Sequence, residues 1–231
     1  MKLIFIDIDN TLLDFDKYTE ESLKKGFKRF SLPEFEPYML DVFHQENDKL
    51  WRKIEEGTLH IDGLKHVRFQ RVFEALHIKP SFDPTLFEAY YRSQLFESAI
   101  PVDGAYKMLD YLSKKYILAV ASNGPYEQQI HRLSLAKMDR YFTYFFISEK
   151  IGYSKPSPFF FLKAFGEINA NRTDIILPKD ACIIGDSLTS DMKGGFNAGM
   201  HTCFFNKKKV DTPPDRIDFA ISDLSKISDV L

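Results

Sequence analysis

The chain has little cysteine and no long apolar run. Only Cys182 and Cys203 occur among 231 residues, and both lie in apolar stretches, so we expect no disulfide framework and a reducing, cytoplasmic setting. Asp7 and Asp9 interrupt the first apolar segment too early for a signal peptide. No stretch reaches the ~20 apolar residues that a membrane-spanning helix needs. The sequence therefore predicts a cytoplasmic protein with no membrane partner.

An excess of charge of one sign is also absent. The 31 basic and 33 acidic residues give a formal net charge of −2 and are interspersed along the chain. This pattern does not indicate a nucleic-acid polymer as a partner. The 44% hydrophobic content is enough to bury a sizeable core. We expect a globular monomer or homodimer that acts on a small molecule.

The order of strand and helix patterns predicts an α/β fold with an insertion. From about residue 102 onward the two patterns alternate, which is typical of a doubly wound parallel sheet. Residues 15–100 show helical periodicity and no convincing strand. The predicted domains are an α/β core of residues 1–14 and 101–231 and a helical domain of residues 15–100. The predicted strands run from Leu3 to Ile8 and over Ile117–Ser122, Tyr144–Ile147, Ala181–Ile184, His201–Phe205 and Phe219–Ile221.

Two carboxylates stand at the end of the first strand. Strand side chains alternate between faces, so Asp7 and Asp9 can project in the same direction. Carboxylates in an apolar run are costly to desolvate unless a cation or hydrogen-bond donors meet them. One of them can be a nucleophile and the other an acid/base. The alternative is that Asp9 and Asn10 only begin a turn.

Three later segments place polar groups at or after other strand ends. Ser122, Asn123 and Gly124 offer a hydroxyl, an amide and backbone N–H groups to an anion such as phosphate. A lysine at Lys155 can neutralise a phosphoryl oxygen. Each also has a purely structural interpretation: a Ser/Thr turn, a surface ion pair or a helix cap. The third segment carries Asp186 and Asp191, of which Asp186 could be a metal ligand or only a helix cap. Because the carboxyl ends of parallel strands meet at the same end of a sheet, the three segments together predict a site.

The four motifs, in this order, resemble those of the haloacid dehalogenase superfamily of phosphohydrolases. The similarity runs from Met1 to about Phe205. The resemblance implies a Rossmann-like core with a cap domain inserted after the first motif. Residues 51–57, 122–124 and 148–156 further resemble the pyrimidine 5'-nucleotidase branch. The family's D-x-D-x-T-L motif falls on Asp7, Asp9, Thr11 and Leu12, its hydroxyl on Ser122, its lysine on Lys155 and its metal-binding acids on Asp186 and Asp191.

This resemblance implies a phosphoric monoester hydrolase that uses Mg²⁺. Asp7 would attack phosphorus to form an aspartyl-phosphate, and Asp9 would serve as acid and then as base. Asp7, Asp186 and the main-chain carbonyl of Asp9 would hold the metal, with Asp191 in support. The phosphate would meet Ser122 and Lys155 and the substrate-binding residues Thr11, Asn123 and Gly124.

The substrate would be selected by the cap, where the loop Glu56 to His60 faces the active site in capped relatives. Trp51 and His60 are its predicted substrate-binding residues. The implied substrate is a nucleoside 5'-monophosphate, and a sugar phosphate or phosphoglycolate is the alternative. A 2-haloacid dehalogenase is disfavoured because it characteristically lacks the second acid that Asp9 supplies. A non-catalytic phospho-ligand binder is disfavoured because no motif residue is missing. Other candidates for contact with a base or with polar groups are Arg52, Lys65, His66, Arg68, Phe69, Tyr90 and Tyr91, most of which we expect to pack or face water.

Overall fold

The structure, a computed structural model, describes residues 1–210 and 217–231. It contains two compact units. Met1–Asp14 and Ala99–Leu231 form the first, which we call the core unit, and Phe15–Ser98 form the second, which we call the helical unit. The predicted boundaries lie between residues 14 and 15 and between residues 100 and 101. Within the described ranges, no helix combines the length and the apolar character that crossing a membrane requires.

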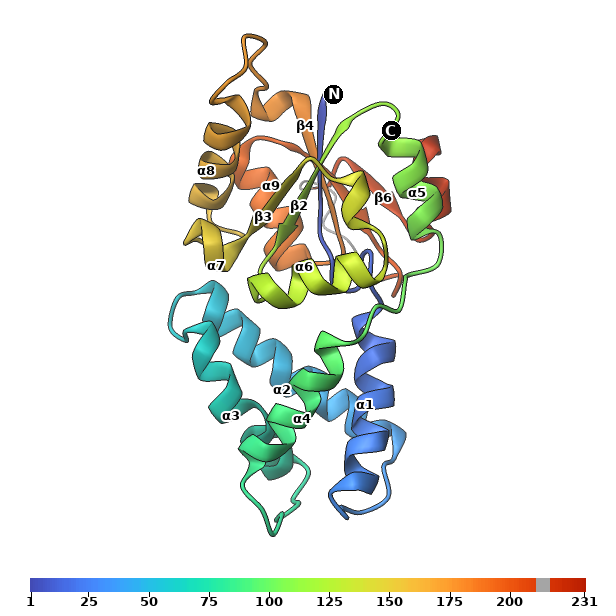
Figure 1. The fold of residues 1–231 in the computed structure, drawn as a ribbon, viewed down its shortest axis with the longest axis vertical. Coiled ribbons are helices and arrows are strands. Elements are labelled where there is room, and N and C mark those ends of the chain that lie inside the picture. Colours follow the sequence, from blue (N-terminus) through green and yellow to red (C-terminus); the bar gives the residue numbers. More distant parts are fainter. Residues whose placement is uncertain (211–216) are drawn as a thin grey trace. The chain divides into compact units, whose positions relative to one another are not determined.

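The core unit is built on a six-stranded sheet in the order β3-β2-β1-β4-β5-β6, so β1 lies inside it (Figure 1). Every neighbouring pair of strands is parallel. This confirms the predicted doubly wound α/β class. The strands are β1 (Leu3–Ile6), β2 (Ile117–Ser122), β3 (Tyr144–Ile147), β4 (Ala181–Gly185), β5 (His201–Phe205) and β6 (Phe219–Ile221).

The first strand ends at Ile6, earlier than the predicted end at Ile8. The backbone N–H of Asp7 still donates to the Ile184 carbonyl at 3.0 Å. The Ile8 carbonyl, by contrast, accepts from the backbone N–H groups of Leu12 and Leu13 at 2.8 and 2.9 Å. The chain therefore turns immediately after Asp7, which leaves this carboxylate at the carboxyl ends of the strands.

Alternation along β1 separates two apolar layers. Ile4 and Ile6 belong to a buried cluster with α5 (Ala105–Leu112) and the C-terminal 3-10 helix Leu224–Asp229. Leu3 and Phe5 belong to a second cluster with α8 (Pro158–Asn169). A strand buried on both faces needs apolar side chains throughout, as these four are. Among its described residues, the core unit also contains the α-helices α6 (Tyr126–Leu135), α7 (Ser148–Ile151) and α9 (Lys193–Ala198).

The helical unit packs its four helices around aromatic rings. Phe69 lies 4.6 Å from Phe87 and 5.2 Å from Tyr91, measured between ring centroids. Beside them is a buried ion pair, in which Arg68 donates to both oxygens of Glu88 at 2.9 and 2.6 Å. Phe69, Tyr91 and Arg68 are thus part of the interior, as buried aromatic and paired charged groups should be. The helices are α1 (Phe15–Arg29), α2 (Pro37–Glu55), α3 (Ile61–Ala75) and α4 (Pro84–Phe96).

The loop between α2 and α3 contains the residues that end one helix and begin the next. Gly57 has a φ of 73°, the left-handed conformation that favours glycine directly after a helix. Thr58 stands shortly before α3, and threonine is a common N-cap residue. Instead His60 is the N-cap, because its Nδ1 accepts from the backbone N–H of Asp62 at 3.3 Å. The Thr58 hydroxyl donates back to the Lys53 carbonyl at 3.1 Å.

Candidate active site

Three adjacent strands carry the predicted site residues to one edge of the sheet. Ser122 ends β2, Asp7 follows β1 and Asp186 follows β4. The register pairs Ile6 of β1 with Val120 and Ile184. Asp7 therefore extends from the sheet at the level where its two neighbouring strands end. Carboxyl ends of parallel strands are where open α/β sheets bind ligands.

Lys155 joins the cluster from a loop and bonds three strand-end groups. It follows α7, and its side chain is almost fully buried. Its Nζ donates to Asp7 Oδ1 at 2.7 Å, to Asp191 Oδ1 at 2.6 Å and to the Ala121 carbonyl at 2.6 Å. All three protons of the ammonium group are accounted for by these bonds. The arrangement fixes a positive charge beside the predicted nucleophile.

Burial and charge oppose each other in this cluster. Burial raises the pKa of Asp7 to about 7, the neighbouring Lys155 works against that rise, and the Asp191 and Asp9 charges add to it. Burial by itself would lower the pKa of Lys155, but the Asp191 and Asp7 charges outweigh it and the pKa rises. The lysine stays protonated at neutral pH. The carboxyl group of Asp7, the predicted nucleophile, is held near its titration point.

Asp191 reaches the cluster through a short π-helix, Leu188–Met192. Its carboxylate is held at both ends: Oδ1 accepts from Lys155 and Oδ2 accepts from the Ser187 backbone N–H at 3.1 Å. Gly185 makes room for it, since a Cβ there would lie 2.2 Å from Asp191 Oδ2. Glycine at this position is required by the close approach of the carboxylate.

The carboxylates of Asp7, Asp186 and Asp191 form a set that fits a hard cation. One oxygen from each lies within 4.8 Å of the others. Carboxylate oxygens are preferred ligands of Mg²⁺, which also keeps several waters. Asp7 and Asp191 are buried and Asp186 is partly exposed, so the set lies at the boundary with solvent. The residues present are therefore compatible with a divalent cation.

The side chain of Asn123 is committed to the protein itself. Its Oδ1 accepts from the Lys155 backbone N–H at 2.8 Å, and its Nδ2 donates to the Lys155 carbonyl at 2.9 Å. This two-point bond holds the lysine loop against the end of β2. That Asn123 binds substrate stays a prediction; in the structure its side-chain amide holds the backbone of Lys155.

The Asp9 carboxylate accepts hydrogen bonds from a separate set of partners, which were not predicted from the sequence. Its Oδ1 accepts from Arg132 Nη1 at 2.6 Å, and its Oδ2 accepts from Gln129 Nε2 at 2.7 Å. Gln129 Nε2 also donates to Ser122 Oγ at 2.8 Å. Both partners lie on α6. Arginine and glutamine in a helix are usually solvent-exposed, so only their placement on the inner face of α6 could have revealed them.

The sequence also matches a protein-family model. The model for haloacid dehalogenase-like hydrolases matches residues 1–199, most of the chain. The chain belongs to the haloacid dehalogenase-like hydrolase family.

Curated relatives of this haloacid dehalogenase-like hydrolase align over nearly its whole length. A Bacillus subtilis protein described as a HAD-hydrolase, YfnB, is 31% identical, with 94% of this chain and 88% of YfnB covered. The pyrimidine 5'-nucleotidase PynA of Streptococcus pneumoniae is 32% identical, with 89% and 84% covered. A crystal structure of YfnB bound to magnesium, described as revealing interdomain movement, has a TM-score of 0.86 at 28% identity and covers 100% of this chain and 98% of that one.

Thr11 and Gly124 of this haloacid dehalogenase-like hydrolase differ in their surroundings. Thr11 is fully buried, and its hydroxyl has no hydrogen-bond partner among the described residues. The Gly124 backbone N–H donates to Ser122 Oγ at 3.2 Å. Their contact with a substrate stays a prediction. Ser122 Oγ accepts two hydrogen bonds, from Gly124 and Gln129, which leaves its own proton to be donated.

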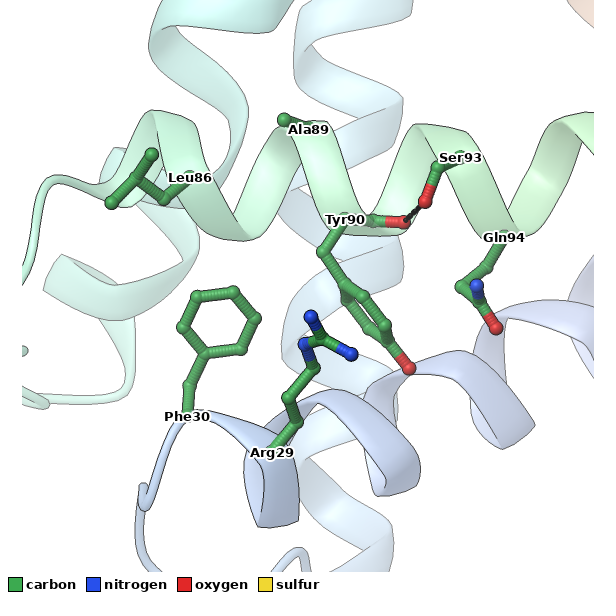
Figure 2. A pocket seen from close by; sticks show the side chains of 7 residues that line it. All are labelled: Arg29, Phe30, Leu86, Ala89, Tyr90, Ser93 and Gln94. Atoms are coloured by element: carbon green, nitrogen blue, oxygen red, sulfur yellow. Dashed lines mark hydrogen bonds between the residues drawn. The ribbon is translucent and has the colours of Figure 1, made fainter.

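The predicted cap residues of the hydrolase lie on α2 and the loop that follows it. Trp51 is partly buried and packs against the small cluster of Leu50, Ile54 and Leu64. The His60 side chain is 79% exposed. Tyr90, by contrast, lines a pocket of about 450 Å³ between α1 and α4, where the Arg29 guanidinium lies 5.4 Å from its ring centroid. Figure 2 shows that pocket and its other lining residues, Phe30, Leu86, Ala89, Ser93 and Gln94.

Proposed function

We propose that this chain is a Mg²⁺-dependent phosphatase that hydrolyses small phosphate monoesters through an aspartyl-phosphate on Asp7. One observation carries the proposal. A buried carboxylate with a pKa of about 7 is bonded to a buried ammonium group and faces two further carboxylates. A second acid, Asp9, is held nearby on different partners. A nucleophile, a cation, an acidic metal set and an acid/base are the parts that phosphoryl transfer needs.

In the first step an oxygen of Asp7 attacks phosphorus, and the bond from phosphorus to the leaving oxygen breaks. Asp9 gives its proton to that oxygen, so the leaving group departs as an alcohol. Lys155 lies 2.7 Å from Asp7 and neutralises charge on the transferring phosphoryl group. The remaining proton of Ser122 is available to a phosphoryl oxygen. Fixed charges of this kind supply most of the stabilisation in such reactions.

In the second step water attacks the phosphorus of the aspartyl-phosphate and gives a proton to Asp9. Inorganic phosphate leaves and the Asp7 carboxylate is restored, so both residues return to their starting states. Asp7, Asp186 and the Asp9 carbonyl would hold Mg²⁺, with Asp191 fixed behind them by Lys155 and Ser187. When bound, the cation supplies Lewis-acid stabilisation of the phosphoryl oxygens.

The favoured substrate class is a nucleoside 5'-monophosphate. Two relatives of similar length, PynA at 32% and YjjG of Escherichia coli at 29% identity, are named pyrimidine 5'-nucleotidases. The alternative is a small sugar phosphate, because the glyceraldehyde 3-phosphate phosphatase of Pyrococcus furiosus is 28% identical and 93% covered. Asp9 argues against carbon–halogen hydrolysis, which has no leaving oxygen to protonate.

A panel of monoesters tests the activity and the substrate together. Nucleoside monophosphates, glyceraldehyde 3-phosphate, phosphoglycolate and p-nitrophenyl phosphate are assayed for phosphate release with Mg²⁺ and with EDTA. We expect release with Mg²⁺, loss with EDTA and the highest kcat/KM for a pyrimidine nucleotide. Release that EDTA leaves unchanged would contradict the role of the metal, and no release from any ester would overturn the function.

Trp51 and His60 are our candidates for contact with the leaving group. Trp51→Ala or His60→Ala should penalise nucleotides by about 1–3 kcal/mol of transition-state stabilisation, if stacking here resembles base–aromatic stacking elsewhere. p-Nitrophenyl phosphate should be little affected, since the core unit supplies the phosphoryl-transfer groups. Tyr38→Ala is the matched control, because Tyr38 is an exposed aromatic residue on the same helix as Trp51. Equal losses on both esters would mean that the two residues only support the fold.

A further inference from the structure

Helix α6 buries two polar side chains against the second acid. Gln129 is 0% exposed and Arg132 is 1% exposed. Burying a guanidinium group costs several kcal/mol unless a charge and hydrogen bonds meet it. If α6 only covered the sheet, apolar residues at both positions would avoid this desolvation cost. The bonds that these two side chains make are therefore the reason to look for a function.

The hydrogen bonds form a closed network in which the donor and the acceptor of each bond are determined. Arg132 Nη1 donates to Asp9 Oδ1 at 2.6 Å and to Gln129 Oε1 at 2.9 Å. Because the oxygen of the Gln129 amide faces the guanidinium, its nitrogen faces the other way. That nitrogen donates to Asp9 Oδ2 at 2.7 Å and to Ser122 Oγ at 2.8 Å. Both oxygens of Asp9 are thus held, and the same amide also orients the Ser122 hydroxyl.

We propose that Arg132 and Gln129 are positioning residues for proton transfer by Asp9, an inference that rests on the phosphatase function proposed above. Each carboxylate oxygen has two acceptor sites, so one bond to each oxygen fixes the plane of the carboxylate and leaves a site for the travelling proton. Gln129 ties that plane to Ser122. The acid/base and the phosphate-binding hydroxyl then keep a constant separation, which a proton transfer at hydrogen-bond distance requires.

Leaving groups of different basicity separate this role from a structural one. p-Nitrophenolate departs without a proton, whereas the alkoxide of an alkyl monoester needs one. For Arg132→Met we expect kcat/KM to fall about 30- to 100-fold on the best alkyl monoester of the panel, the scale of a misplaced catalytic group. The loss on p-nitrophenyl phosphate should stay below about 3-fold. KM should change little, because a side chain that is 1% exposed has no surface for substrate.

A double-mutant cycle with Asp9→Asn is the control. If Arg132 acts through Asp9, Arg132→Met should cost almost nothing further in the Asp9→Asn background. Gln129→Met, of nearly the same volume, is the second test should Arg132→Met not fold: it should lower kcat/KM on both esters, because Ser122 Oγ also loses a donor, and lower it further on the alkyl monoester. Arg132→Lys should recover part of the alkyl ester activity, because it keeps a cation facing Asp9.

The outcomes distinguish the two proposals. Equal losses on both esters, or a full additional loss in the Asp9→Asn background, would overturn the positioning role while the phosphatase function stands. A wild-type protein that releases phosphate from no ester would overturn the function itself, and the positioning role with it.

Discussion

Replacing Lys155 by Met should destabilise the core unit strongly. The change keeps the length of the side chain and removes three hydrogen bonds of 2.6 to 2.7 Å, two of them to carboxylates. Asp7 and Asp191 are then buried without the cation that both contact. Removing one partner of a buried ion pair typically costs about 3–5 kcal/mol, and we expect a loss of that size in the free energy of unfolding at pH 8.

The loss should shrink at low pH. Burial already raises the pKa of Asp7 to about 7, and Lys155 opposes the rise, so the variant's Asp7 accepts a proton more readily. A protonated carboxyl tolerates the missing cation, and at pH 5.5 the destabilisation should be smaller than at pH 8. Mg²⁺ should likewise stabilise Lys155→Met more than it stabilises the wild type, because it supplies the missing positive charge.

Urea denaturation followed by circular dichroism, with EDTA and with Mg²⁺ at both pH values, measures these effects. Lys163→Met is the matched control: Lys163 is an exposed lysine of α8 that donates to the Ile151 carbonyl at 3.0 Å, and its replacement should stay within about 0.5 kcal/mol. A Lys155→Met variant as stable as this control at pH 8 would refute our account of the cluster.

Other consequences of the cluster can be checked separately. Asp7→Asn should abolish turnover without unfolding the protein, because an amide is a poor nucleophile; turnover within about tenfold of wild type would contradict this. Because Asp7 has a pKa of about 7, it is mostly protonated at pH 6, and the affinity for Mg²⁺ measured by calorimetry should be roughly 10-fold weaker at pH 6 than at pH 8; equal affinities would speak against Asp7 as a ligand. Asp186→Ala should raise the Mg²⁺ concentration needed for half-maximal activity, and an unchanged metal titration would remove Asp186 from the ligand set. Gly185→Ala would bring a Cβ to 2.2 Å from Asp191, so we expect a destabilisation of about 1–3 kcal/mol in thermal unfolding and a loss of activity; a fully stable and active variant would disprove the tight fit.

The sheet was readable from the sequence because its strands are short apolar runs with clear ends. β2, β3, β5 and β6 have the predicted bounds, and β4 extends one residue further, to Gly185. Asp7 and Asp186 could also be placed, since they stand directly after such runs, and Lys155 lies in the segment that follows β3. Parallel packing then brings strand ends together whatever their distance in sequence.

The remaining contacts depend on tertiary packing that local pattern does not encode. Gln129 and Arg132 look like surface residues of an amphipathic helix, and only the position of Asp9 makes their burial favourable. His60 caps α3 because its ring nitrogen accepts a hydrogen bond from the Asp62 N–H, although threonine, present at Thr58, is the commoner capping residue. The two hydrogen bonds between the Asn123 amide and the Lys155 backbone also depend on tertiary packing, and contact of Asn123 with phosphate stays a prediction.

The central place of β1 has a consequence for biosynthesis. The strand that precedes Asp7, the predicted nucleophile, is made before its partners, which begin at Ile117 on one side and Ala181 on the other. Contacts between such distant segments form slowly, because a long loop must close before they stabilise anything. The whole helical unit emerges from the ribosome in the meantime and is contiguous in sequence. A nascent chain halted before Ala181 would carry Asp7 on an unpaired strand edge, which is prone to aggregate.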